Sequence, residues 1–523
     1  MTNNTHSSEY LSQFSVEPIS SISDGVNKLP RPEFYNSFLN AETHLSNFLM
    51  YYTSPGGHTL LRSAIRSYER CLTGKKDLEC GEYANNICLT AGATSGIFYY
   101  FRYMRNKKAL FLGYHYIHFK VAAEENNVSY KVLVSKYPNR VAPTIDEVAK
   151  IIHDFDFVTV TLPCNPSGEM YNRDEIEQLL RLCIRNDVQL LIDKCQWDEI
   201  ALSKKQEYYS IGQAVLSQKA ENNTTIITSF SKTRSIPGAR LGYAFGPHLI
   251  IEHMIYMNNL IIWHPSTFLL IPVIIDFVAQ LQYLNESKII QMEDNFYLKF
   301  RHYIMLSYQS KECIKFILSC ISPNNIGKYK SQLLSQIEAN QTLIELNYNY
   351  LTKRLKELDI FATRFDGGFN VLVLYPNLSN YDESEFKKYI KELSDLCILT
   401  QSDFCASTVS NKPIWIRVTL ALEHVDFKDT LDSFLCALKK LNKTSVYKGY
   451  KRDKIEMRGD RAEMSDFPLY LNTVAGGLDR RDQTIGGFSF VVKIYAVPVV
   501  EIIGQLLYLL GRYGFNAQFG DCL

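Results

Sequence analysis

Short apolar segments alternate with longer amphipathic ones between about residue 85 and residue 250. Six of the apolar segments have the length and the β-branched or aromatic composition of buried strands. They cover residues 108–114, 130–135, 156–163, 188–195, 225–231 and 240–246. Strands that are apolar on both faces and are separated by helices are typical of a mainly parallel, doubly wound sheet. We therefore predict an α/β fold in which helices cover both faces of this sheet, giving three layers.

The clearest of the intervening helices is predicted from Arg173 to Asn186. One face of it carries the apolar residues Ile176, Leu179, Leu180, Cys183 and Ile184. Asn172 stands at the position of an N-cap, and Glu175 stands where a capping box places an acid. The pattern therefore indicates both the start and the buried face of this helix.

In the second half of the chain the pattern becomes mostly helical. A stretch rich in Tyr, Lys and Cys near 285–330 is interpreted as a helical insertion, and residues 338–360 are predicted to form a long amphipathic helix. Strand-like segments at 367–376 and 413–422 then flank a helical pattern at 382–393. This α+β pattern predicts a second, smaller domain.

These patterns divide the chain into four parts. They are an N-terminal segment 1–50 that packs with the small domain, a large domain 51–335 that includes the insertion, a small domain 336–445, and an extension 446–523. A charged stretch marks the start of the extension, and an apolar helix from Val499 to Leu510 must be buried somewhere. We predict that the extension is a module of its own, outside the site described below.

The bulk composition excludes several classes of protein. The chain has 523 residues, of which 46% are hydrophobic and 21% charged, as in an ordinary soluble globular protein. Its formal net charge is only +1, whereas nucleic-acid binders commonly carry a clear excess of basic residues. We therefore expect no nucleic-acid partner.

Neither a membrane span nor a metal site is expected. The most apolar window, 260–279, is interrupted by His264, Pro265, Pro272 and Asp276, which indicates buried helix and turn. The amino terminus is polar and lacks the pattern of a signal peptide. The twelve cysteines form no CxxC pair and have no zinc-like spacing with histidines. Free thiols in a reducing compartment are the simplest interpretation, and we expect a cytoplasmic protein.

Three polar residues fall at the carboxyl ends of predicted strands, where doubly wound folds gather their sites. They are Asn165 in "PCNPSG", Asp193 in "LLIDKCQ" and Lys232 in "SFSKTRSIPGARLGY". A lysine at a strand end usually reaches solvent. The order and spacing of these three segments, however, resemble the class I/II aminotransferases, which are fold type I pyridoxal-phosphate enzymes. The resemblance covers about residues 20 to 445.

The resemblance implies pyridoxal 5′-phosphate as cofactor and assigns roles around its ring. Lys232 would hold the cofactor as a Schiff base and later move the substrate proton. Asp193 would pair with the pyridine nitrogen, and Asn165 would bond the ring oxygen O3′ and help to bind substrate. Tyr116 matches the aromatic residue that stacks on the ring. Since successive strand residues point to opposite faces, Lys194 is expected to face away from the cofactor.

Further residues are implied for the phosphate. Gly92, Ala93 and Thr94 lie at a predicted helix start, where free N–H groups favour an anion. Ser229 and Arg240 would add a hydroxyl and a bidentate guanidinium. Tyr52 resembles the tyrosine that reaches the phosphate of the neighbouring subunit, which implies a homodimer with shared sites.

Arg417 matches the arginine that binds the substrate carboxylate, and residues 24–32 resemble the segment that closes over substrate. A buried guanidinium inside an apolar strand also needs an anionic partner on physical grounds. The chain departs from the family's usual pattern at three positions: Tyr114 stands where proline is more common, Lys194 replaces an acid, and Gln196 replaces the tyrosine that bonds O3′. The region after 445 matches no part of the family.

The function implied is transfer of an amino group between an amino acid and a 2-oxo acid. Relatives that are lyases, cyclases or oxidases acting on an amino acid keep the same lysine, aspartate and arginines, so this alternative stays open. A ligand-sensing regulator would need a basic helix-turn-helix, for which the first 45 or so residues are too few and too uncharged. A catalytically inactive scaffold is disfavoured, because every cofactor-facing position except Gln196 keeps the family's chemistry.

Overall fold

The computed structural model describes residues 22–23, 25–40, 52–73, 86–137, 140–206, 208–284, 296–307, 311–358, 360–375, 382–404 and 414–452. It gives the backbone alone for 37–40, 296–297, 307, 313 and 442–452. The chain divides into two compact units, Met1–Lys454 and Ile455–Leu523, and the described residues belong to the first. Most of the predicted extension 446–523 thus lies outside the described residues.

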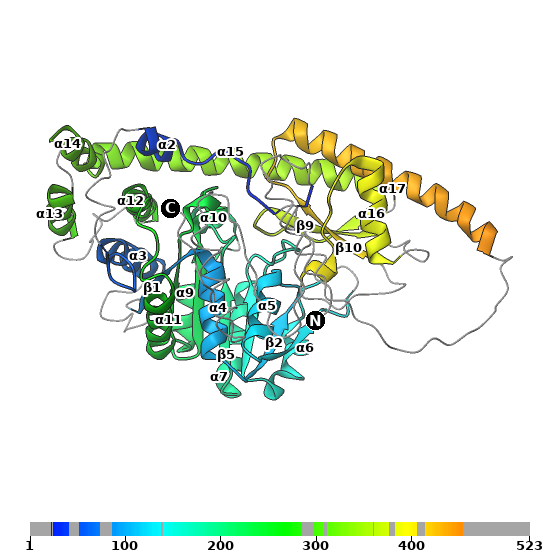
Figure 1. Ribbon diagram of the computed structural model, residues 1–523, viewed down its shortest axis with the longest axis horizontal. Helices are drawn as coiled ribbons and strands as arrows, with labels where there is room; N and C mark the ends of the chain where they lie inside the picture. The colour runs from blue at the N-terminus through cyan, green and yellow to red at the C-terminus, as the bar shows by residue number, and fades with distance from the viewer. Residues whose placement is uncertain are drawn as a thin grey trace, which may run out of the picture. The chain divides into compact units, whose positions relative to one another are not determined.

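A seven-stranded sheet forms the centre of the first unit (Figure 1). Its strands are β1 (Ile87–Thr90), β2 (Lys108–Leu112), β3 (Ser129–Leu133), β4 (Phe157–Thr161), β5 (Gln189–Asp193), β6 (Thr224–Ser229) and β7 (Gly242–Phe245). The strand order is β1-β7-β6-β5-β4-β2-β3, and β7 alone runs antiparallel to its neighbours. The six predicted strands and the mainly parallel sheet are confirmed, while β1 was not predicted.

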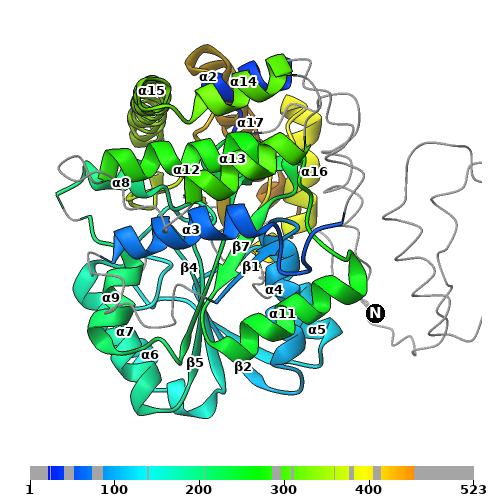
Figure 2. The same ribbon diagram turned by 90° about the vertical axis from the view of Figure 1, so that its left-hand side faces the viewer.

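Helices cover both faces of this sheet, so the predicted three layers are confirmed (Figure 2). One face carries α3 (Thr59–Leu72), α6 (Ile145–Ala149), α7 (Arg173–Arg185) and α9 (Ile211–Gln218), and the other carries α4 (Gly92–Tyr103), α5 (Ile117–Glu125) and α11 (His248–Ile261). Successive side chains of a strand point to opposite faces of the sheet, so each buried strand contributes to the core on both sides. In β5, Leu190 and Ile192 pack into the core beneath α3 and α7, whereas Leu191 packs into the core beneath α4 and α5.

Helix α7 begins as the sequence predicts. The Asn172 side chain accepts a hydrogen bond from the Glu175 backbone N–H at 2.9 Å, and the Glu175 carboxylate accepts one from the Asn172 N–H at 2.8 Å. This reciprocal capping box satisfies two backbone donors that the first helical turn leaves without partners. Short helical pieces connect the remaining strands: η3 (Ile152–Asp154), α8 (Glu199–Ser203), α10 (Phe230–Thr233) and η4 (Pro237–Ala239).

A second, antiparallel sheet follows, in the order β10-β9-β8. It contains β8 (Phe361–Ala362), β9 (Asn370–Tyr375) and β10 (Ile414–Thr419), and it packs with α16 (Glu383–Ser394), η5 (Gln401–Phe404) and α17 (His424–Arg452). It has a hydrophobic cluster of its own, and Leu372 and Phe404 also pack with Tyr114 and Val141 from the part of the chain that forms the large sheet. Helix α17 continues to Arg452, so the charged stretch that marks the start of the extension begins within a helix.

In chain order, the helices α12 (Leu270–Leu284), α13 (Phe296–Ser307), α14 (Lys311–Cys320) and α15 (Pro323–Lys356) come between α11 and the second sheet. Helix α2 (Glu33–Asn40) packs with α12 and α15. Helix α15 starts earlier than predicted and reaches from α12 to the second sheet (Figure 1). Gln341 on it donates to the Ala201 carbonyl of α8 at 2.6 Å, and Asn347 donates to the Leu420 and Leu422 carbonyls after β10, both at 2.8 Å.

The apolar window 260–279 spans the end of α11, a turn and the buried start of α12. Across the described ranges, no helix is long and apolar enough to cross a membrane. Among the same residues, no group of three or more His, Cys, Asp and Glu could hold a metal ion.

Candidate active site

Asp193 is the last residue of β5 and lies opposite Thr161, the last residue of β4, and opposite Ile227, two residues before the end of β6. Its side chain is buried, and Oδ1 accepts the backbone N–H of Cys195 at 2.9 Å. Burial raises the pKa of Asp193, although the contacts from Cys195 and Thr161 oppose that rise. A carboxylate at a strand end with these properties can bond a protonated ring nitrogen.

Lys232 lies in α10, which begins directly after β6. Ser229 caps this short helix, since its hydroxyl accepts the Ser231 N–H at 3.2 Å. The Lys232 Nζ donates to the Gly25 carbonyl at 2.8 Å, and the Asn27 side chain donates to the Lys232 carbonyl at 2.8 Å. The N-terminal segment predicted to close over substrate therefore contacts the predicted catalytic lysine.

Lys194 points to the opposite face of the sheet, as strand alternation predicts. Its Nζ donates to Glu69 on α3 at 3.1 Å and to Glu199 at 3.4 Å, and all three side chains are buried. Burial alone would lower the pKa of Lys194, but the two carboxylates outweigh it and raise that pKa. This lysine is charged and engaged in a buried ion cluster away from Asp193.

Helix α4 and Arg240 together form a corner suited to an anion. The helix starts at Gly92, and Ala91 before it supplies no side-chain cap, so the N–H groups of the first turn, including those of Ala93 and Thr94, point out of the helix end. Arg240 Nη2 donates to the Ala91 carbonyl at 3.3 Å. Gly92 has φ +73°, and a Cβ there would lie 3.0 Å from Arg240 Nη2. The backbone N–H groups and the nearby guanidinium are the kinds of donor that bind a phosphate group.

Two further predicted residues are Tyr116, which follows β2, and Gln196, which follows β5. Tyr116 precedes α5, is partly buried, and has its ring centroid 4.8 Å from that of His118. Gln196 is buried, and its Oε1 has no hydrogen-bond partner within the described part of the chain. A Cβ at Gly368 would lie 2.5 Å from that oxygen, so the Gln196 amide packs against a glycine turn of the second sheet.

Arg417 belongs to the second sheet, and its side chain contacts Asn165 and Ser23. It lies in β10 and is 4% exposed, and its guanidinium donates to the Ser23 carbonyl at 3.1 Å and to Asn165 Oδ1 at 3.3 Å. The guanidinium also lies 4.9 Å from the Phe404 ring centroid. A Cβ at Gly25 would lie 2.6 Å from Arg417, so the residue that binds Lys232 also packs against this arginine.

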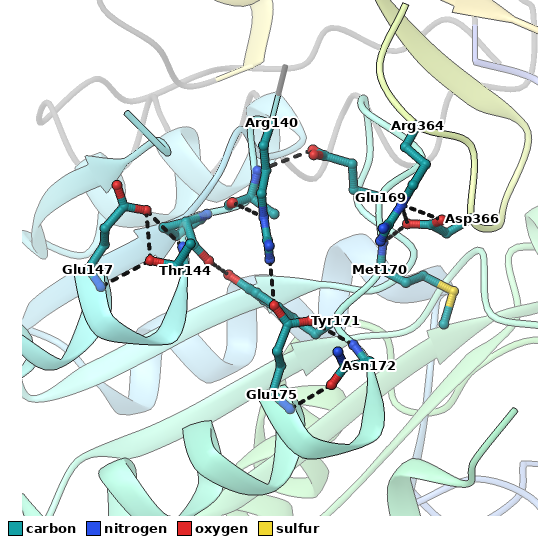
Figure 3. Close-up of polar contacts among 12 residues, drawn as sticks. Arg140, Thr144, Glu147, Glu169, Met170, Tyr171, Asn172, Glu175, Arg364 and Asp366 are labelled. Carbon is teal, nitrogen blue, oxygen red and sulfur yellow. Dashed lines mark hydrogen bonds and ion pairs between the residues drawn. The ribbon is translucent and has the colours of Figure 1, made fainter. Parts of the chain in front are cut away.

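The loop after β4 is held from two sides at Glu169 and Met170 (Figure 3). Glu169, further along it, is buried and accepts the Val141 N–H at 3.1 Å. The next residue, Met170, donates its N–H to Asp366 of the second sheet at 3.1 Å. Neither Glu169 nor Asp366 was singled out from the sequence, because their partners lie far away along the chain. The loop thus connects the two sheets next to Asn165.

Tyr52 is apart from this cluster. Its side chain is 82% exposed, and its ring centroid lies 5.7 Å from that of Trp263 and 6.0 Å from that of His264. Leu260 and Ile261, nearby in the chain, are exposed as well. Within one chain the structure joins Lys232, Arg417 and Asn165 through direct contacts and through Gly25, places Gly92 beside Arg240, and leaves Tyr52 at the surface.

Comparisons with known proteins agree with this arrangement. The family described as aminotransferase class I and II matches residues 36–308, just over half of the chain. The chain is 26% identical over 151 residues to an aspartate aminotransferase of Bacillus sp. (strain YM-2), covering 29% of this chain and 34% of that protein. It is 25% identical over 240 residues to a putative aminotransferase of Bacillus subtilis (strain 168), covering 44% of this chain and 58% of that one. These alignments therefore span about a third to just under six tenths of the relatives' own length.

Solved structures match over a longer stretch. A double mutant of the Thermus thermophilus aspartate aminotransferase has a TM-score of 0.59 at 17% identity, covering 84% of this chain and 97% of that one. An aromatic aminotransferase from Pyrococcus horikoshii OT3 has a TM-score of 0.60 at 15% identity, covering 83% and 99%. At these identities the likeness shows that the fold is shared.

Proposed function

Because the chain belongs to the class I and II aminotransferases, we propose that it is a pyridoxal-phosphate-dependent enzyme that moves an amino group between an amino acid and a 2-oxo acid. One observation carries the proposal. Gly25 accepts a hydrogen bond from Lys232 Nζ and packs against the Arg417 guanidinium, so an amine nucleophile and a carboxylate receptor lie on either side of one residue. An α-amino acid presents the two groups that such a site would handle.

When bound, the cofactor supplies an aldehyde that condenses with amines and a ring that accepts electrons. The fit rests on this chain's own donors: the corner formed by Gly92 and Arg240 for the phosphate, and Asp193 for the ring nitrogen. Ala93, Thr94 and Ser229 would support the phosphate, with Tyr116, Asn165 and Gln196 around the ring.

The chain's residues then divide the work on the substrate. Arg417, with Asn165 beside it, would orient the substrate carboxylate and so fix the direction of the Cα–H bond. Lys232, once its amine is free, would take that proton and return it elsewhere as a general base and acid. The segment that includes Gly25 and Asn27 would exclude water from the lysine.

We further propose a homodimer with shared sites. The exposed Tyr52 lies against Trp263, and Leu260 and Ile261, shortly before Trp263 in the chain, are exposed large apolar side chains as well. Such a face suits an isologous contact through which Tyr52 would reach the other subunit's phosphate. Light scattering should give the mass of two chains, and Tyr52→Phe should weaken cofactor affinity without loss of folding. We also propose a cytoplasmic location, which the eight described cysteines, all free thiols, support.

The test of the proposed function is spectroscopic. Purified protein mixed with pyridoxal phosphate should develop a visible absorption band, and borohydride should fix the cofactor on Lys232. Amino acids from a panel should then bleach the band, and a 2-oxo acid should restore it, which separates transamination from lyase, cyclase or oxidase chemistry. Absence of the band, or a label on Lys194, would rule out the proposal.

A further inference from the structure

Arg234 lies two residues after Lys232, on the segment that positions the catalytic amine. Its side chain is 4% exposed, and a guanidinium in such surroundings is costly unless it is paired. Nε donates to Asp276 on α12 at 2.7 Å, and Nη1 donates to Asp198 at 2.6 Å. Burial would lower the pKa of Arg234, but the two carboxylates raise it, so the group is charged.

Asp198 belongs to the other half of the site. It follows Gln196 by two residues and Asp193 by five, and it caps α8 by accepting the N–H groups of Ile200 and Ala201 at 3.1 and 3.2 Å. Its second oxygen accepts the bond from Arg234. One ion pair therefore joins the segment that carries Lys232 to the segment that carries the ring-facing residues Asp193 and Gln196.

The surroundings of the Arg234–Asp198 ion pair do not form a second ligand site. A cavity of about 30 Å³ lies beside it, lined among others by Arg234, Asp198 and Lys194. This volume is of the size needed for a water molecule and too small for a substrate. The carboxylate of Asp276, the other anchor, is completed by Tyr35 at 2.8 Å and Gln280 at 2.5 Å. The cluster is filled by its own side chains.

Stabilisation of the fold is a weak explanation for the presence of the buried Arg234–Asp198 ion pair. A buried ion pair often adds no more to stability than apolar residues of the same volume, whereas it fixes the relative position of the segments it joins. Arg234 meets its two carboxylates through different nitrogens of one planar group, so their directions are set together. Resting on the proposed function, we infer that Arg234 is a positioning residue that fixes the Lys232 amine relative to Asp193 and Gln196.

The experiment uses two variants and a control in the full chain. Asp198→Asn keeps the N-cap of α8, because asparagine caps as well as aspartate, but it removes the charge that ties Arg234 to the segment carrying Asp193, and only Asp276 remains as an anionic partner. Arg234→Lys keeps the charge but cannot reach both carboxylates with one fork. Tyr35→Phe is the control: it removes one buried hydrogen bond from the same network, on α2, without touching either active-site segment.

The first measurement is the rate at which the visible band appears when pyridoxal phosphate is added to cofactor-free protein. It should fall by about 10-fold or more in Asp198→Asn, because small displacements of a reacting group are costly in rate. In the half-reaction with an amino acid, kcat should fall by a similar factor while KM stays within about twofold, since Arg417 is intact. Arg234→Lys should show the same pattern, and Tyr35→Phe should match wild type in both measurements.

The outcomes separate this inference from the proposed function. If wild-type protein never forms the band, the proposed function fails. If wild type forms it, and Asp198→Asn and Arg234→Lys behave like Tyr35→Phe, the pair is structural only and the inference alone is overturned. Melting temperatures of all four proteins show whether a variant has lost its fold, and a rate loss that equals that of Tyr35→Phe counts against positioning.

Discussion

Replacing Arg417 by lysine tests the substrate end of the site most directly. The guanidinium of Arg417 is almost fully buried, lies against the Phe404 ring, and donates to Ser23 and Asn165. Lysine keeps the positive charge but loses the planar pair of donors that matches a carboxylate. We expect Arg417→Lys to fold and to bind cofactor, but to bind and orient amino acids poorly.

The size of the effect follows from the bonds that are lost. A hydrogen bond to a charged group contributes about 1.5–3 kcal/mol. Loss of the bidentate geometry, with one charged bond retained, should therefore cost about 3 kcal/mol of transition-state stabilisation, or about 100-fold in kcat/KM. Most of it should be seen in KM if the carboxylate is bound equally in the ground state.

The assay compares two substrates in both proteins. Wild type and Arg417→Lys are mixed with an amino acid and with the corresponding amine that lacks the α-carboxylate, and bleaching of the visible band is followed in single turnovers. The loss should be confined to the amino acid, because the amine has no group for Arg417 to bind. Equal losses for both substrates, or no loss for the amino acid, would refute the assignment of Arg417 as the carboxylate receptor.

Three further predictions concern the protein around the site. Lys194→Met should leave Glu69 and Glu199 without their cation and lower the unfolding free energy by about 3 kcal/mol, measured by denaturant titration, while borohydride still labels Lys232. Gln196→Tyr should lower the pH at which the visible band of the bound cofactor changes, since a phenol is a stronger hydrogen-bond donor than an amide; identical titrations would mean that residue 196 does not touch the ring. His115 is buried and burial lowers its pKa to about 4, so the stability it contributes above pH 6.5 is lost as the pH falls from 6.5 to 4. That loss is about 3 kcal/mol, and in His115→Gln the denaturation midpoint should depend less on pH over this window; an unchanged dependence would contradict the assignment.

Much of the fold follows from local pattern. The strands β2 to β7 and the start of α7 could be predicted because burial on both faces and capping leave a signal within a few adjacent residues. Strands β1 and β7 both have four residues, but β1 follows the polar pair Asn85 and Asn86 directly and ends just before Gly92, so its apolar run is short. The start of α15 was missed because its polar first turns resemble the preceding insertion, although Pro323 at the first helical turn is a common start signal.

The residues of the site were likewise only partly predictable from the sequence. Asn165, Asp193 and Lys232 could be placed because the ends of parallel strands meet at one edge of a sheet. The residues that hold this edge in place, such as Asp276 and Arg234, could not be predicted from the sequence. Asp276 was visible in the sequence only as a charge that interrupts an apolar window, and its partner Arg234 lies 42 residues away. No local pattern records a pair that forms only when two helices pack.

Helix α15 has a mechanical consequence for the two sheets. Gln341 fastens it to α8, and Asn347 fastens it to the chain after β10. These two attachments are six residues apart, which corresponds to about 9 Å or less than two helical turns. If the second sheet swings toward Lys232, the helix acts as a lever with a very short hinge zone. Such a movement must be accommodated by bending of α15 within those turns or by sliding of α15 along α12. Substitutions between Gln341 and Asn347 would therefore make the movement of the second sheet harder or easier without contacting the substrate.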